Sequence, residues 1–93
     1  MHQGKIRVPD HVAALIRNMH PQLKKKIRSA LEIIKNNPES GKALRAELKG
    51  LMTFRVSHFR IIYKTGSRGL LELVAIGPRK TIYEETLRLI SKN

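Results

Sequence analysis

Two arginines lie on either side of a predicted turn. Arg55 and Arg60 flank the dipeptide Ser57-His58, and both belong to segments that alternate apolar and polar residues. If Ser57-His58 forms a two-residue hairpin turn, Arg55 lies directly opposite Arg60. Like charges in that position destabilise a sheet, so a bound phosphate, which arginine holds through two parallel hydrogen bonds, explains the pair better. The alternatives are an exposed sheet face and pairing with Glu72.

More basic side chains follow the last predicted strand. Gly77-Pro78 turns the chain sharply, and Arg79 and Lys80 come just before a helix that begins near Thr81. The free N–H groups of a helix N-terminus also favour an anion, so these side chains extend the predicted phosphate site. Tyr83 falls in the first turn of that helix, where it is either a core anchor or a base-stacking or proton-carrying group.

The remaining reactive residue types are few. The chain has no cysteine, and its four histidines lack metal-ligand spacing, so we expect no disulfide, no metal and no cofactor. His58 is the histidine nearest the two arginines. It is either an RNA contact or proton carrier, because imidazole exchanges protons near neutral pH, or simply a turn residue.

The net charge is the strongest compositional signal. Nineteen Lys and Arg against seven Asp and Glu give a formal net charge of +12. On so small a chain this charge favours a polyanionic partner: nucleic acid, a ribosome, an anionic membrane or an acidic protein. The alternative is a solvated basic surface that serves solubility.

The periodicity of apolar residues predicts the elements that position these side chains. In chain order they are an edge strand at 5–8, helices over about 10–19 and 21–36, strands over 51–56, 59–64 and 70–76, and a helix over 81–91. Asp10 is the expected N-cap of the first helix, and Pro21 suits the first position of the second. Turns are expected at 57–58 and 66–69, and Leu44 and Leu48 anchor the polar connection 37–50.

The predicted hairpin has one apolar face and one basic face. The apolar face carries Met52, Phe54, Val56, Phe59, Ile61 and Tyr63, and the other carries Thr53, Arg55, Arg60, Ile62 and Lys64. The apolar face can pack on the two helices, and a slip of one residue would put arginines in the core. We therefore expect an α+β fold in the order β-α-α-β-β-β-α, with the helix hairpin packed on one face of the sheet.

The length predicts a single domain over residues 1–93. Residues 1–8 lack the apolar run of a signal peptide, and no stretch approaches the ~20 apolar residues that span a membrane. We therefore expect a soluble cytoplasmic protein without a membrane partner.

Three segments together resemble the RelE/ParE toxin superfamily. They are Leu48-Lys49-Gly50 to Phe54-Arg55-Val56, then Phe59-Arg60-Ile61-Ile62-Tyr63, then Ile76-Gly77-Pro78-Arg79 to Tyr83. The resemblance covers nearly the whole chain. It implies a small twisted antiparallel sheet with the helix hairpin on one face and a cleft on the other.

For RelE-like members, the resemblance implies metal-independent cleavage of messenger RNA in the ribosome by attack of the 2′-hydroxyl on the adjacent phosphate. Arg60 would then hold that phosphate and Arg79 would stabilise charge on it. Tyr83 would stack on a base or move a proton. Further RNA contacts would come from Lys49, Arg55, His58 and Lys80.

The same resemblance implies a partner. We expect an acidic antitoxin that lies across the basic surface, forming a hetero-oligomer, beside the ribosome and mRNA as targets. The alternative function is that of a ParE-like inhibitor of DNA gyrase without nuclease activity. ParE-like proteins generally lack the arginine-plus-tyrosine site, so Arg60, Arg79 and Tyr83 favour the nuclease.

Overall fold

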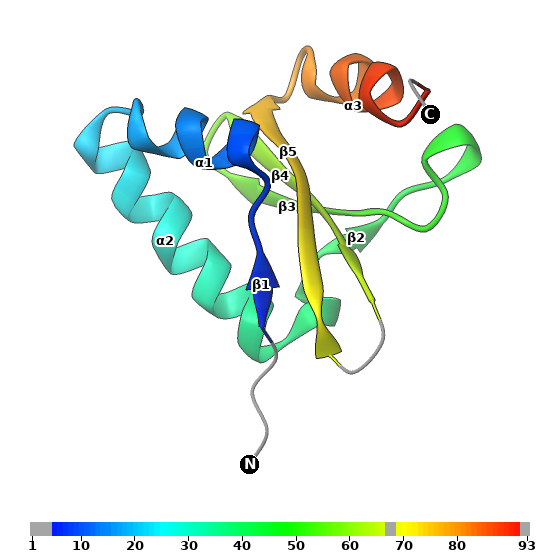
Figure 1. Ribbon diagram of the computed structural model, residues 1–93, viewed down its shortest axis with the longest axis horizontal. Helices are drawn as coiled ribbons and strands as arrows, with labels where there is room; N and C mark the ends of the chain where they lie inside the picture. Colours follow the sequence, from blue (N-terminus) through cyan, green and yellow to red (C-terminus); the bar gives the residue numbers. More distant parts are fainter. Residues whose placement is uncertain (1–4, 67–68, 92–93) are drawn as a thin grey trace.

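A five-stranded sheet lies at the centre of the protein, in the order β1-β5-β4-β3-β2 (Figure 1). The computed structural model describes residues 5–66 and 69–91, and its α+β architecture is the predicted one. The elements are β1 (Ile6–Arg7), α1 (Asp10–Arg17), α2 (Pro21–Asn36), the 3-10 turn η1 (Pro38–Ser40), β2 (Lys42–Ala43), the 3-10 turn η2 (Ala46–Leu48), β3 (Met52–Val56), β4 (Phe59–Thr65), β5 (Leu71–Pro78) and α3 (Ile82–Ser91).

The hairpin register is confirmed. Arg55 pairs with Arg60 and Val56 pairs with Phe59 across an antiparallel ladder. The turn residues are Ser57 and His58, and Ser57 takes the positive φ of 55°, which places the unusual backbone conformation one residue before His58. The predicted turn at 66–69 includes residues 67 and 68, which lie outside the described part of the chain.

Three details of the predicted architecture are wrong. The sheet is mixed, because β1 runs parallel to β5 while the other pairs are antiparallel. A further strand, β2, pairs with β3 inside the connection that was expected to be irregular. Asp10 is the first residue of α1, not its cap: Pro9 precedes the helix, and no side chain caps it. In the first turn, the Asp10 carboxylate still suits the positive end of the helix dipole.

A β-bulge shifts the alternation of β5. Ile62 pairs with Ala75 but Tyr63 pairs with Leu73, so Val74 is an extra residue on β5. The carbonyl of Val74 lies 3.2 Å from Nε2 of His11 on α1. The bulge lets the residues before and after it face the same core, which strict alternation would not allow.

The larger core lies between the sheet and the helix hairpin. Apolar side chains of α1 and α2 meet those of β3, β4 and β5, as the hairpin pattern predicted. Its buried members are Val12, Ile27, Ala30, Ile34, Val56, Ile61, Tyr63, Leu71, Leu73 and Ile76. Figure 1 shows α1 and α2 together on one side of the sheet, with α3 at a separate end.

A second, smaller core lies on the opposite face. Ile62 and Ala75 of the sheet pack with Ile82 of α3, and Leu44 and Leu48 pack against them. Leu44 and Leu48 thus anchor the connection as expected, but in this second cluster. The opposite face is therefore not left open along its length, as the sequence suggested, because α3 covers part of it. The cleft is confined to the remainder.

Tyr63 fastens the connection after α2 to the sheet. Its side chain is fully buried, its hydroxyl donates to the Pro38 carbonyl at 2.7 Å, and it accepts from the Gly41 N–H at 3.1 Å. The side chain therefore satisfies two backbone groups that no helix or strand would satisfy. This contact fixes the segment that forms one wall of the cleft described below.

Replacement of Tyr63 by phenylalanine is expected to cost about 1–3 kcal/mol of folding free energy at pH 7, because it leaves two backbone groups without their partner. Burial raises the pKa of the Tyr63 phenol, against a smaller lowering by the Gly41 hydrogen bond. The folded protein thus favours the neutral phenol. The contribution of the Tyr63 hydroxyl to folding stability is therefore present below pH ~10 and is lost as the pH rises through the pKa of the folded state. Urea unfolding measured at pH 7 and at pH 11 should give a smaller difference in the free energy of unfolding between wild type and Tyr63→Phe at pH 11. A gap that is constant with pH would contradict this role.

Among the described residues, no helix is long and apolar enough to cross a membrane.

Candidate nucleic-acid interface

Three arginines, on or directly after three successive strands, line one open cleft of about 650 Å³. Arg55 comes from β3, Arg60 from β4, and Arg79 from the residue after β5. Tyr83, in the first turn of α3, lines the same cleft. The remaining lining residues are Ser40, Gly41, Lys42, Thr53 and Phe54. The fold thus brings Arg55 and Tyr83 together although they lie 28 positions apart in the sequence.

A smaller cavity of about 310 Å³ shares the same three arginines. It adds His58 from the β3–β4 turn and Lys80 from the segment before α3. The turn and this segment are joined directly, because the backbone N–H of Arg79 donates to the His58 carbonyl at 2.8 Å. The two cavities therefore form adjoining surfaces on either side of the arginines.

Lys49 is the predicted site residue that the fold does not bring to these cavities. It follows η2, is exposed, and lines neither the cleft nor the smaller cavity. Lys49 was expected to contact RNA because the resemblance to the RelE/ParE superfamily implied it. The turn at Gly50, with a φ of 96°, lies between Lys49 and the start of β3.

Arg60 is held in place by the backbone of its own hairpin. It is half-buried, and its Nη1 donates to the carbonyl of Phe59 at 3.0 Å and to that of Ser57 at 3.5 Å. These contacts use one nitrogen of the guanidinium group. Since the group carries five donors in a planar fork, the others remain for a ligand.

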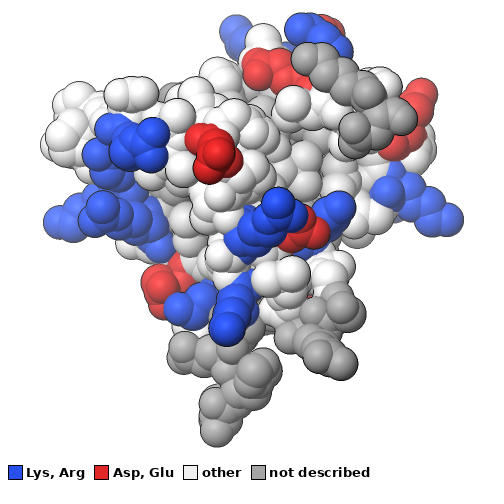
Figure 2. Space-filling view, in the orientation of Figure 1, with Lys and Arg blue, Asp and Glu red and all other residues white. Residues whose placement is uncertain are grey.

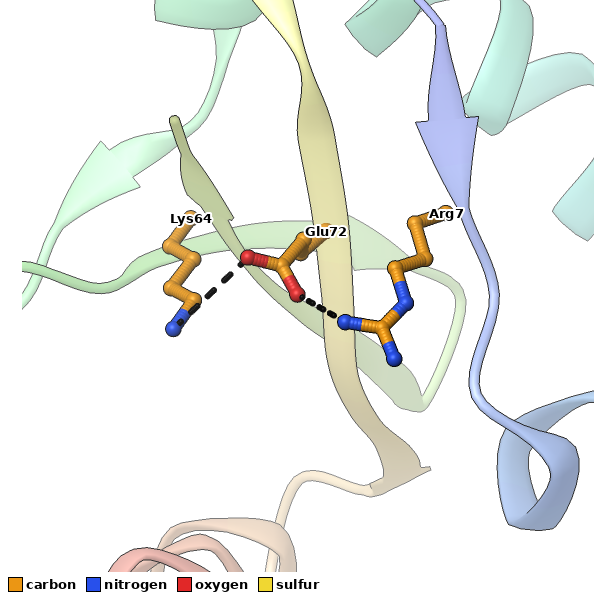
Figure 3. A network of polar contacts seen from close by, with 3 residues as sticks. All are labelled: Arg7, Lys64 and Glu72. Atoms are coloured by element: carbon orange, nitrogen blue, oxygen red, sulfur yellow. Dashed lines mark hydrogen bonds and ion pairs between the residues drawn. The ribbon is translucent and has the colours of Figure 1, made fainter. Parts of the chain in front are cut away.

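Glu72 does not neutralise the arginines of the cleft. Its carboxylate lies between Arg7 of β1, at 2.9 Å, and Lys64 of β4, at 3.8 Å (Figure 3). The alternative in which Glu72 pairs with Arg55 or Arg60 is therefore wrong. Within residues 5–66 and 69–91, Arg55, Arg60 and Arg79 form no ion pair with any carboxylate.

Both interpretations of Tyr83 find support in its position. It is partly buried and packs against the second core, which makes it an anchor of α3. It also lines the cleft with the arginines. Because Tyr83 is held against this core and also lines the cleft, it can present its ring to a ligand without a large loss of side-chain freedom.

Sequence reasoning missed the wall of the cleft formed by Ser40, Gly41 and Lys42. These residues fall in the connection 37–50, and β2 is only two residues long, too short to produce an alternating pattern. Thr53 was assigned to the correct face but not to the site. Its position directly opposite Lys42 depends on the pairing of β2 with β3, which the sequence does not show.

Basic side chains also cover surfaces away from the cleft. Figure 2 shows Lys and Arg gathered over the part of the surface that α2 occupies in Figure 1. On α2 they are Lys24, Lys25, Lys26, Arg28 and Lys35. The charge of the chain is thus spread over both sides of the molecule, and the cleft is distinguished by convergence, not by charge alone.

Comparison with known proteins gives one family. The family model described as the ParE toxin of the type II toxin–antitoxin system parDE matches residues 6–83, which include every side chain of the cleft. No protein with a curated description matches the chain.

Several solved structures share the fold at low sequence identity. A chain of the toxin–antitoxin complex RelBE2 from Mycobacterium tuberculosis is 20% identical, with a TM-score of 0.73 over 85% of this chain and 94% of that one. A chain of the archaeal RelE–RelB complex from Pyrococcus horikoshii is 15% identical, with a TM-score of 0.69 over 84% and 97%. The E. coli toxin RelE in the free state, with two arginines replaced by alanine, is 14% identical, with a TM-score of 0.74 over 98% and 97%.

Proposed function

This chain belongs to the ParE toxin family of type II toxin–antitoxin systems, and we propose that it acts by cutting messenger RNA in the ribosome. The observation that carries the proposal is the convergence of Arg55, Arg60 and Arg79 in one cleft, with no carboxylate paired to them in the described residues and Tyr83 beside them. Such a cluster is suited to a phosphate with developing negative charge.

The reaction needs little from the protein beyond position and charge. The 2′-oxygen of the ribose forms a bond to phosphorus, and the bond from phosphorus to the 5′-oxygen of the next nucleotide breaks. The products are a cyclic phosphate and a free 5′-hydroxyl. The substrate supplies its own nucleophile, so cationic donors that hold the phosphate in line can provide much of the rate.

Each side chain has a role in this proposal. Arg60, fixed by its hairpin, holds the scissile phosphate, and Arg79 stabilises the charge that develops on it. Tyr83 stacks on a base. The proton of the 2′-hydroxyl passes to a general base, and the 5′-oxygen gains a proton. His58 and Tyr83 are the two candidate proton carriers beside the arginines.

A cognate antitoxin completes the proposal. The solved structures of similar fold include toxin–antitoxin complexes, and this chain carries a net charge of +12. An acidic antitoxin segment laid across the basic surface would neutralise that charge and block the cleft. The proposed complex is a hetero-oligomer of the two chains.

A second candidate is inhibition of DNA gyrase without nuclease activity. The description of the matched family favours it, because the family is that of ParE toxins. A gyrase inhibitor needs a protein-binding surface, whereas three arginines that converge in one cleft beside an aromatic side chain suit a phosphate and its base better. That cluster is the reason for preferring RNA cleavage.

Two assays on the purified protein separate the candidates. In the first, the protein is added to a translating extract, and the ends of a defined message are mapped by primer extension. In the second, it is added to gyrase, relaxed plasmid and ATP, and supercoiling is followed. We expect new 5′-hydroxyl ends that depend on translation, with normal supercoiling. Intact message together with blocked supercoiling would assign the chain to the second candidate.

A further inference from the structure

One buried hydroxyl in the wall of the cleft has no partner. Thr53 lies on β3 and is 9% exposed, and its Oγ1 forms no hydrogen bond within the described residues. We propose that Thr53, with Lys42 opposite it, forms a nucleobase-binding subsite that selects the position of the cut. The inference rests on the proposed RNA cleavage and adds the group that reads the base.

The orphaned hydroxyl is unusual within this chain. The other buried threonine, Thr86 on α3, is fully covered, and its Oγ1 donates to the Ile82 carbonyl at 2.7 Å. A buried polar group without a partner lowers folding stability, so such groups are rare unless something outside the chain satisfies them. Among the described residues, Oγ1 of Thr53 is the buried side-chain polar atom that has no hydrogen-bond partner.

The cleft has two chemically different ends. Arg55, Arg60 and Arg79 form the arginine end, while Ser40, Gly41 and Thr53, with Lys42 as the one cation among them, form a hydroxyl-bearing end. Thr53 and Arg55 are two residues apart on one face of β3, which separates them by about 7 Å along the strand. A nucleotide whose phosphate is held by the arginines can therefore extend its base toward Thr53.

The buried hydroxyl of Thr53 favours a base over a second phosphate at the hydroxyl-bearing end. A threonine hydroxyl both donates and accepts, as base edges do, whereas a phosphate only accepts. Lys42 pairs with Thr53 across β2 and β3 and lines the same cleft, and its ammonium is a donor that favours base edges with acceptors. Tyr83 lines the same cleft and supplies an aromatic face for the base.

Of the side chains beside Thr53 on this face, Ile62 is fully buried in the second core, whereas two others can move aside for a ligand. Lys42 and Arg55 are both exposed, and neither forms an ion pair within the described residues. Long charged side chains on a surface change rotamer rapidly. In the proposed subsite, a base approaches Thr53 from the side of Lys42 and Arg55, both of which line the cleft.

The first arm of the test measures stability in the absence of RNA. Thr53→Val keeps the shape of the side chain and removes the orphaned hydroxyl, so we expect Tm to rise by about 4–8 °C. The matched control Thr86→Val removes a hydroxyl that already has a partner and should lower Tm or leave it unchanged. A fall in Tm for Thr53→Val would show that the hydroxyl is satisfied within the folded chain, which overturns the proposal.

The second arm measures selectivity in a translating extract. Four messages are used that differ only in the base beside the mapped cut, and primer extension gives the cleavage of each. We expect the ratio of cleavage between the best-cut and the worst-cut message to fall about 3- to 10-fold in Thr53→Val. This change corresponds to the loss of one hydrogen bond. Thr86→Val should keep the wild-type ratio.

The outcomes separate this inference from the function on which it rests. If wild type cuts the messages and Thr53→Val keeps the same ratio, or lowers all four cleavages equally, the base subsite is wrong while RNA cleavage stands. If wild type cuts none of the messages, RNA cleavage itself is wrong and the subsite is overturned with it.

Discussion

Replacement of Arg60 by alanine is expected to lower the rate of message cleavage about 100- to 1000-fold, the usual effect of removing one preorganised donor to a developing negative charge. Arg60 is half-buried in the cleft, its Nη1 is fixed by two backbone carbonyls, and no carboxylate of the described residues pairs with it. The folded structure makes no other visible use of its charge. The measurement is primer extension on a translated message with purified wild type and variant.

Two further variants make this result specific. Arg60→Lys keeps the charge but loses the planar fork, so we expect a rate between those of wild type and Arg60→Ala. Arg17→Ala removes the same charge from the exposed end of α1, away from the cleft, and should retain wild-type cleavage. Equal losses for Arg17→Ala and Arg60→Ala would show that net charge, and not the cleft, drives the reaction.

Replacement of Gly41 by alanine is expected to destabilise the fold by about 2–4 kcal/mol. A Cβ at this position would collide with the Tyr63 hydroxyl and lie 2.7 Å from the Thr53 carbonyl oxygen. To relieve that contact, either β3 or the side chain of Tyr63 must move. Movement of Tyr63 would also break its two hydrogen bonds to the backbone, so the cost of overpacking and the cost of lost hydrogen bonds add. The Gly41 backbone has φ −82° and ψ −175°, which alanine adopts readily, so the cost comes from space alone.

Urea unfolding of Gly41→Ala beside Gly66→Ala isolates this cause. A Cβ at Gly66 would meet nothing closer than the Leu70 carbonyl at 3.4 Å, an ordinary contact. We expect Gly66→Ala to change the free energy of unfolding by less than ~1 kcal/mol. Similar unfolding midpoints for the two variants would contradict the close packing of Gly41 against Tyr63.

The hairpin of β3 and β4 was predictable because two independent constraints agree on its register. Ser57-His58 allows a two-residue turn, and only one register keeps Arg55 and Arg60 out of the core. The helix hairpin was predictable for a similar reason, since its apolar stripes have a single sheet face to cover. In these segments local pattern and tertiary packing require the same structure.

The missed features depend on contacts that leave no local pattern. The strand β2 has two residues and exists because its partner β3 is already in place. The parallel pairing of β1 with β5 joins residues 65 positions apart, as between Arg7 and Glu72. Likewise, α3 lies against Ile62 because Gly77 leaves space for Ile82, and a Cβ there would come within 2.9 Å of the Ile82 side chain.

The site was predictable as a set of arginines but not as a cavity. Arg55 and Arg60 follow from the hairpin, and Arg79 follows from the end of β5, so their convergence needs only the order of three antiparallel strands. The wall opposite them comes from η1 and β2, which the sequence left irregular. Thr53 could have been identified only from its lack of a hydrogen-bond partner, which is a property of the folded chain.

The convergence of three guanidinium groups on one phosphate can be measured directly by NMR. A short RNA with deoxyribose at the cut position binds without being cleaved, and the side-chain Nε–H signals of the arginines report each contact. The signals of Arg55, Arg60 and Arg79 should shift together at the lowest RNA concentrations, before those of Arg7, Arg17 and Arg28. Signals that shift in parallel across all the arginines, with no early response from the three in the cleft, would show that RNA meets only a diffuse basic surface.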